Sequence, residues 1–208
     1  MSSKDRLDRK FLKSLNEQWV LRFSTIHPEG DRYDGVVTAI RPDFIVVCDE
    51  TNWEFDGIQI FPKRIITDIR DGKYEACANR IVRGNNALSQ LVLPEWLEAC
   101  QTLTDVLQAM QQQQIWPAVE TLSDNKQKDY FLYLGSITKF GDHSFWIRSY
   151  DADGKWEKQF EISFSEVFRI EFGSRYCNHF NDYMKSQSAK CFPAGKTKPH
   201  DKRKRIGK

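Results

Sequence analysis

Basic residues gather at the C-terminal end of the chain, where they could attract polyanions. Four of them are adjacent: Lys202, Arg203, Lys204 and Arg205. Residues 188–208 hold eight Lys or Arg against one Asp. Neighbouring cations bind phosphate-rich polymers at low salt with little sequence preference. The same composition is typical of a disordered solubilising tail, and it also occurs in membrane-surface or targeting segments.

Aromatic residues beside an arginine form a second candidate. Trp146, Arg148 and Trp156 fall in or beside expected strand ends and hairpins. If these rings are exposed, they can stack on bases or hold a peptide, whereas buried rings would fill the core. These three residues and the four adjacent tail cations are therefore the predicted positions for binding nucleic acid or a partner.

Two short motifs invite a metal or catalytic interpretation. Asp151 and Asp153 precede Gly154 as in a calcium loop, but a calcium loop needs six or more oxygen ligands and a later acidic residue at a fixed spacing. We expect a hairpin turn there. Cys177 and His179 lie two apart in an expected helix, so their side chains point in different directions and form neither a zinc site nor a nucleophilic pair.

Other signatures of enzymes are missing from the sequence. No glycine-rich loop that could cradle phosphates occurs, and the carboxylates are spread along expected strands in a way that suits solvated faces. We therefore predict a protein that is not an enzyme and that uses no cofactor or metal. A hydrolytic enzyme is the third hypothesis, and it requires acidic or histidine residues to converge in a pocket.

Composition and charge place the chain among globular proteins. Hydrophobic residues make up 40% of the 208 residues, yet no apolar run is long enough to span a membrane, and the polar N-terminus lacks a secretory signal. The five cysteines are scattered, which favours reduced thiols and a cytoplasmic location. The net charge of +2 combines +3 over residues 1–14, −8 over 15–187 and +7 over 188–208. The acidic body should repel nucleic acid, which leaves the tail or a local patch to attract it.

A weak repeat with a period of about one hundred residues organises the chain. The matching landmarks are Gly35 with Gly135, Phe44 with Phe145, Ile66 with Val167, Ile69 with Ile170 and Tyr74 with Tyr176. Each copy contains short segments rich in β-branched and aromatic residues, separated by turn formers. Five such segments in about 55 residues predict a small, strongly bent antiparallel sheet closed toward a barrel.

The expected fold class is mainly β with α, built from two small five-stranded antiparallel barrels. An amphipathic pattern predicts an N-terminal helix over 1–16. The first barrel with its trailing helix occupies 17–82, and a helical connector occupies 83–114. The second barrel with its trailing helix occupies 115–187, and a disordered basic tail occupies 188–208.

Each copy resembles an Sm-like or SH3-like barrel. The resemblance rests on a glycine-containing strand, a short turn and a second apolar strand, at 35–47 in the first copy and 135–148 in the second. RNA-binding Sm proteins carry an Asn in the turn and an Arg-Gly pair before the last strand, and neither occurs here, so the RNA pocket of that family is not carried over. The chain also resembles uncharacterised bacterial proteins built around a segment such as 145–172, a likeness that implies no activity.

These observations lead to two functional hypotheses. The first is a non-enzymatic adaptor that takes a segment of a protein partner at a barrel edge or between the barrels, by strand addition. The second is a protein that binds RNA or single-stranded DNA, using barrel aromatics to stack bases and the basic tail for nonspecific attraction.

Overall fold

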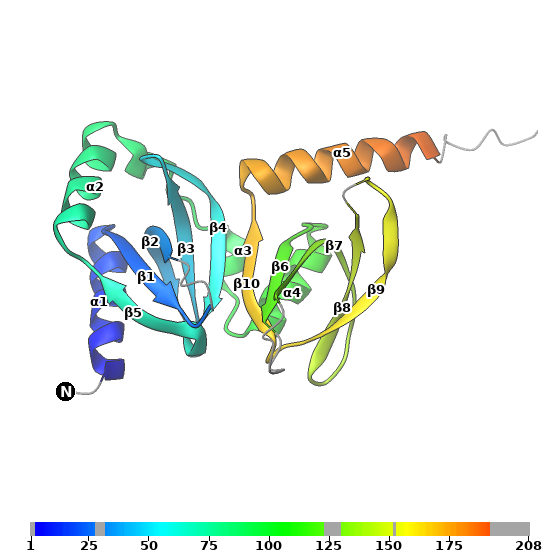
Figure 1. Ribbon diagram of the computed structural model, residues 1–208, viewed down its shortest axis with the longest axis horizontal. Coiled ribbons are helices and arrows are strands. Elements are labelled where there is room, and N and C mark those ends of the chain that lie inside the picture. Colours follow the sequence, from blue (N-terminus) through cyan, green and yellow to red (C-terminus); the bar gives the residue numbers. More distant parts are fainter. Residues whose placement is uncertain (1–2, 28–31, 123–129, 152, 192–208) are drawn as a thin grey trace, which may run out of the picture.

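A computed structural model describes residues 3–27, 32–122, 130–151 and 153–191 of the chain (Figure 1). In chain order the elements are α1 (Ser3–Glu17), β1 (Val20–Thr25), β2 (Arg32–Ile40), β3 (Phe44–Thr51), β4 (Glu54–Pro62), the 3-10 turn η1 (Lys63–Ile65), β5 (Ile66–Arg70), α2 (Lys73–Gly84), the 3-10 turn η2 (Ala87–Gln90), α3 (Glu95–Glu98), α4 (Leu103–Gln112), β6 (Ala118–Leu122), β7 (Tyr130–Phe140), β8 (Ser144–Tyr150), β9 (Trp156–Ser163), β10 (Val167–Phe172) and α5 (Arg175–Cys191). All ten expected strands are present.

The prediction of two closed five-stranded barrels is wrong. The ten strands form a single antiparallel sheet in the order β5-β1-β2-β3-β4-β10-β6-β7-β8-β9, and β5 and β9 at its ends do not pair with each other. Closing the first half into a barrel would require β4 to pair with β5, but β5 pairs with β1 and the far edge of β4 pairs with β10. Each half is therefore a curled set of five strands, and hydrogen bonds run continuously from one half into the other (Figure 1).

The two halves repeat each other down to their irregularities. The β2–β3 ladder has a bulge between Val37 and Ala39, and the β7–β8 ladder has one between Ile137 and Lys139. The next hairpin of each half is also irregular, after Cys48 in β3 and after Arg148 in β8. Because a bulge bends a strand at one defined point, matching bulges give the two halves the same curl.

A glycine at the same place in each half permits close packing of neighbouring strands. A Cβ atom built on Gly35 would lie 2.4 Å from the carbonyl oxygen of Cys48, and one built on Gly135 would lie 1.9 Å from that of Arg148. Both distances are far below van der Waals contact, so no larger residue fits without moving the adjacent strand.

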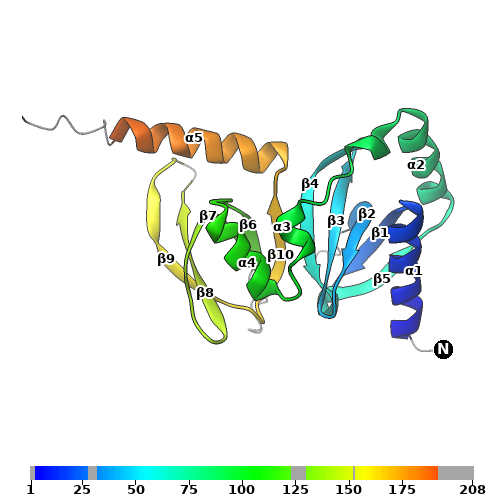
Figure 2. The same ribbon diagram turned by 180° about the vertical axis from the view of Figure 1, so that it is seen from behind.

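Helices close the curled faces and join the halves. The hydroxyl of Ser14 in α1 accepts the N–H of Val37, and the side chain of Gln111 in α4 donates to the carbonyl of the equivalent Ile137. Figure 2 shows α3 and α4 beside the junction, with α1 against the first half. The largest core cluster combines Phe44 and Ile60 of the first half with residues of α4 and of the second half, so the halves share one core.

The trailing helices α2 and α5 each cover a smaller cluster. Ala78 and Val82 of α2 pack on Val20 and Val36, and Cys177 and Met184 of α5 pack on the second half. None of the helices in the described residues is long and apolar enough to span a membrane.

Candidate functional site

The predicted aromatic and basic residues of the second half lie in cation–aromatic pairs. The guanidinium of Arg148 lies 4.8 Å from the ring centre of Trp156, and the ammonium of Lys139 lies 4.5 Å from that of Trp146. Arg148 is exposed, while both tryptophans are half-buried. The structure thus places Arg148 beside Trp156, as a stacking site requires, but each ring already contacts a cation of the chain itself.

The remaining motifs have simple structural roles where they can be seen. The carboxylate of Asp151 accepts the N–H of Lys155 at 2.8 Å, which makes this segment the turn between β8 and β9. Cys177 is buried and His179 is exposed on the same helix, so the two side chains do not meet. Among the described residues no three ligating side chains come together to hold a metal. The tail cations Lys202, Arg203, Lys204 and Arg205 lie outside the described residues.

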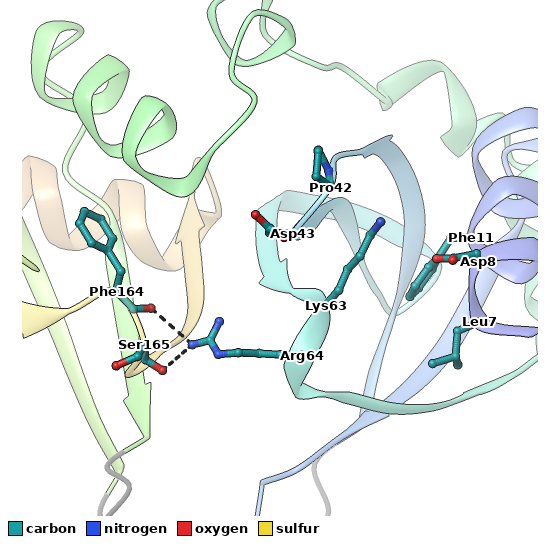
Figure 3. Close-up of a pocket in the computed structure, with 9 residues that line it drawn as sticks. All are labelled: Leu7, Asp8, Phe11, Pro42, Asp43, Lys63, Arg64, Phe164 and Ser165. Carbon is teal, nitrogen blue, oxygen red and sulfur yellow. Dashed lines mark hydrogen bonds between the residues drawn. The ribbon is translucent and has the colours of Figure 1, made fainter. Parts of the chain in front are cut away.

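Arg64 joins the two halves through main-chain contacts. Its Nη2 donates to the carbonyl oxygens of Ser165 at 2.6 Å, Val167 at 2.7 Å and Phe164 at 3.4 Å. Figure 3 shows this side chain reaching from the turn after β4 to the turn before β10. One arginine thus fixes two turns that occupy equivalent positions in the repeat.

A groove of about 600 Å³ opens beside Arg64 (Figure 3). Its lining is Leu7, Asp8, Phe11, Pro42, Asp43, Lys63, Arg64, Phe164 and Ser165. Apolar side chains from both halves line it together with the charged groups of Lys63 in η1, Asp8 in α1 and Asp43 in the turn between β2 and β3. Such a mixed surface suits a protein segment better than a small polyanion, because both signs of charge are present.

A largely buried charged network lies at the junction. The Nε atom of Arg169 in β10 donates to Glu120 in β6 at 2.8 Å, and its Nη2 atom contacts both Glu120 and Glu171. The hydroxyl of Tyr130 also donates to Glu120, and burial together with this carboxylate raises the pKa of Tyr130. The guanidinium lies 5.2 Å from the ring centre of Tyr33 in β2, so the network reaches the first half. Its carboxylates are occupied by partners, which favours a structural role over acid–base chemistry.

Asp49 lies near this network and forms no ion pair with the other described residues. Burial raises the pKa of Asp49 to about 6, the carboxylates of Glu171 and Asp56 add to the shift, and Thr51 and Arg169 oppose it. The equivalent residue of the second half is Ser149, because Asp49 pairs with Gly35 as Ser149 pairs with Gly135. Asp49 therefore places a carboxylate at a position where the second half has the neutral Ser149.

The outer edge of β9 ends the sheet on the side of the second half. Within the described residues β9 pairs only with β8, so one side of its backbone offers unpaired N–H and C=O groups. Half of its eight residues are exposed, among them Lys158 and Gln159. Phe160 is half-buried, and its ring centre lies 5.1 Å from that of Tyr133. The α5 helix contacts the turn before β9, where Tyr183 lies against Gly154.

Comparison of the chain with protein-family models, with curated proteins and with solved structures finds no match. Functional inference therefore depends on the geometry of the chain itself. Sequence reasoning missed three parts of that geometry: the Arg64 contacts, the Glu120–Arg169 pair and the open β9 edge.

Proposed function

We propose that this protein is a non-enzymatic adaptor that binds an extended segment of a protein partner along the outer edge of β9. The proposal is based on a comparison between the two halves of the chain. The strand equivalent to β9 in the first half is β4, and β4 carries an added strand, β10, on that same edge. An open strand edge can bind an extended segment because main-chain hydrogen bonds supply affinity and alternate side chains supply selectivity.

The side chains of β9 suit a selective edge. Lys158 and Glu161 are exposed charges, and Phe160 between them offers an aromatic surface. Charges on an edge strand oppose random pairing because an incoming strand must match them. A partner segment that complements this pattern would therefore be preferred over an arbitrary extended chain.

The test is to identify proteins retained by the full chain, purify the strongest binder and follow amide hydrogen exchange with and without it. We expect slower exchange over β9 when the partner is bound. Two variants, Gln159→Pro and Phe160→Pro, complete the test. The N–H groups of consecutive strand residues point alternately toward the two edges of the strand, so one of the two prolines must remove an N–H group on the outer edge of β9.

We expect the proline variant that retains the wild-type melting temperature to bind the partner roughly tenfold more weakly, from the loss of one main-chain hydrogen bond. A partner that leaves exchange over β9 unchanged, or that binds this variant as tightly as wild type, contradicts the proposal.

Nucleic-acid binding is the second candidate, favoured by the pairing of Arg148 with Trp156. Its test is titration of a fluorescent single-stranded RNA with the full chain, with a chain ending at residue 187 and with Arg148→Ala, at several salt concentrations. Binding that falls steeply with salt and disappears with the tail assigns the attraction to the tail cations. Binding that survives truncation and is lost in Arg148→Ala assigns it to the sheet face, and no binding by the full chain removes this candidate.

A further inference from the structure

Each copy of the repeat contains a cavity between the end of a helix and a strand, at α1 and β2 in the first copy and at α4 and β7 in the second. Its volume is about 180 Å³ in the first copy and about 510 Å³ in the second. The first cavity is lined by Leu15, Gln18, Val36, Val37, Thr38, Leu91 and Leu93. The second is lined by Gln111, Gln113, Gln114, Ile115, Trp116, Ser136, Ile137 and Lys185.

The two cavities lie at equivalent positions, because α1 and α4 end in the same way. Gln18 and Gln114 follow these helices with left-handed backbones, at φ values of 50° and 56°. The N–H of the next residue donates to the carbonyl of Ser14 at 3.1 Å in the first copy and to that of Met110 at 2.9 Å in the second. The two walls therefore correspond residue by residue.

The wall of the first cavity is apolar and is covered by the chain itself. Leu15 and Val36 lie on it, and the segment after η2 closes it with Leu91 and Leu93. Leu91 also packs against the core cluster that contains Val36. Apolar side chains thus leave only a small cavity in the first copy.

The wall of the second cavity is polar. Gln111 takes the place of Leu15, since each comes one residue after the carbonyl that accepts the helix-ending hydrogen bond. Ser136 takes the place of Val36, since each follows the strand glycine of its copy. Within the described residues, no apolar segment comparable with the one after η2 closes this cavity. A larger cavity with amide and hydroxyl groups on its wall suits a ligand that can hydrogen-bond to them.

Positive charge and aromatic rings surround the second cavity. The ammonium of Lys185 in α5 lies 5.2 Å from the ring centre of Trp116, which lies 5.3 Å from that of Trp156. The guanidinium of Arg148 lies 4.8 Å from the ring centre of Trp156, and Arg148 pairs with Ser136 of the cavity wall. None of the described residues that line the cavity is acidic, although residues 15–187 carry a net charge of −8. The cavity is therefore a local cationic site on an acidic body.

Trp116 is held in position from α5, which lies above β6 and β7 in Figure 1. The side-chain amide of Asn181 donates to the carbonyl of Trp116 at 2.9 Å, and the hydroxyl of Tyr150 donates to the side-chain oxygen of Asn181 at 3.1 Å. Asn181 and Tyr150 are both buried. A ring beside such a fixed backbone can stack on a ligand at little entropic cost.

We propose that the second cavity binds a nucleoside phosphate, with the base against Trp116 and the phosphate on Lys185. Lys185 is exposed, so its ammonium can move from the ring to a phosphate. Indole rings stack on any base, and the glutamine amides offer donors and acceptors to base edges. A volume of about 510 Å³ accommodates one such unit.

The unit is supplied either by a free nucleotide or by a single-stranded nucleic acid. In a strand, the row of Trp116, Trp156 and Arg148 would take the next base and phosphate. None of the residues that line the cavity belongs to β9, so this inference does not rest on the proposed function.

The test is calorimetric titration of the full chain with the four ribonucleoside monophosphates, the matching nucleosides and a short single-stranded RNA. We expect dissociation constants of about 10 µM to 1 mM for the monophosphates. The nucleosides should bind roughly tenfold more weakly, because they lack the group that pairs with Lys185. An RNA that binds more tightly than the monophosphates, and that Arg148→Gln weakens, assigns the unit to a strand. RNA that binds no more tightly assigns it to a free nucleotide.

Two variants alter the cavity itself. Lys185→Gln should weaken binding of the monophosphates about tenfold, from the loss of one charge-assisted hydrogen bond. The double variant Gln111→Leu with Ser136→Val gives the second cavity the apolar wall of the first and should also weaken binding about tenfold or more. The matched control is Lys139→Gln, the same charge change at an exposed lysine that lies 4.5 Å from the ring centre of Trp146 outside the cavity. It should bind as wild type does.

Melting temperatures of all variants separate lost binding from lost folding, and Lys185→Gln decides if the double variant does not fold. A wild-type chain that binds neither the monophosphates nor the RNA at up to about 5 mM ligand overturns the inference. Binding that Lys185→Gln leaves unchanged, or that Lys139→Gln weakens equally, also overturns it. Neither result affects the amide-exchange test of β9, so the two proposals fail separately.

Discussion

Strands β4 and β9 occupy the same position in the two copies, but one edge is covered and the other is open. In β4 the central residues are Ile58, Gln59, Ile60 and Phe61, and all four are buried. In β9 the corresponding residues are Gln159, Phe160, Glu161 and Ile162. Gln159 and Glu161 are exposed, Phe160 is half-buried and Ile162 is buried. The ladder geometry is the same, so the difference comes from what lies beside each strand.

This difference shows how one repeated unit can carry either a covered or an open edge. Where β10 covers the edge, Ile58 and Ile60 gain by burial, and where the edge is open, Gln159 and Glu161 take their places and remain hydrated. The scaffold is thus held constant while the residues of the fourth strand differ between a covered edge and an open one.

The largest expected effect tests whether the two copies share one scaffold. Gly135→Ala should destabilise the protein by more than about 4 kcal/mol, and Gly35→Ala should also be severe, because each new Cβ meets a neighbouring carbonyl oxygen. Gly84→Ala is the matched control, since a Cβ there meets nothing within 4 Å. Urea unfolding measures the free energy of unfolding of all three variants. A mild effect at either Gly35 or Gly135 would contradict the structural equivalence of these two positions.

A second prediction contrasts the covered joint with the open end. Glu120 faces Arg169 across β6 and β10, and Ser24 faces Asp68 across β1 and β5 at the equivalent place. Glu120→Ser should cost about 3 to 5 kcal/mol, because Arg169 would remain buried without its main partner. Asp68→Ser removes an exposed pair and should cost less than about 1 kcal/mol. Equal losses in urea unfolding would show that burial at the joint does not matter.

The smallest expected effect concerns Asp49 and its counterpart Ser149. The folded state raises the pKa of Asp49 from its ordinary 3.8 to about 6, so folding favours the protonated form. Wild-type stability should therefore fall as pH rises from about 4 to 6, by roughly 1 to 2 kcal/mol. Asp49→Ser should remove this part of the pH dependence and stabilise the protein at pH values above that window. Thermal unfolding across this range measures it, and identical slopes for both proteins would contradict it.

Much of the fold was predictable because its signals are local. Turn formers such as Pro42 and Gly154, and the recurrence of Gly35 at Gly135, locate strands and the repeat without reference to the rest of the chain. Closure of each barrel was predicted wrongly because the choice of partner for β4 is not local. The available signal was the contrast between Ile58 and Ile60 in β4 and their polar counterparts Gln159 and Glu161 in β9, which distinguishes a covered edge from an open one.

The site was less predictable for a related reason. Trp146, Arg148 and Trp156 were chosen by residue type, and the structure adds that Arg148 and Lys139 already contact the two rings. The buried pair at the joint had a sequence signal in the charges of Glu120 and Arg169 within otherwise apolar strands. Their partnership could not be assigned without knowing that β6 and β10 are neighbours.

The pairing of β4 with β10 also sets an order of events during synthesis. Strand β4 ends at Pro62, but the strand that covers it begins at Val167, so about one hundred further residues must leave the ribosome first. At about 5 to 20 residues per second, the edge of β4 stays uncovered for about 5 to 20 seconds. Nascent chains are therefore exposed to premature pairing with one another through this edge, and a chaperone that shields it would act between translation of these two strands.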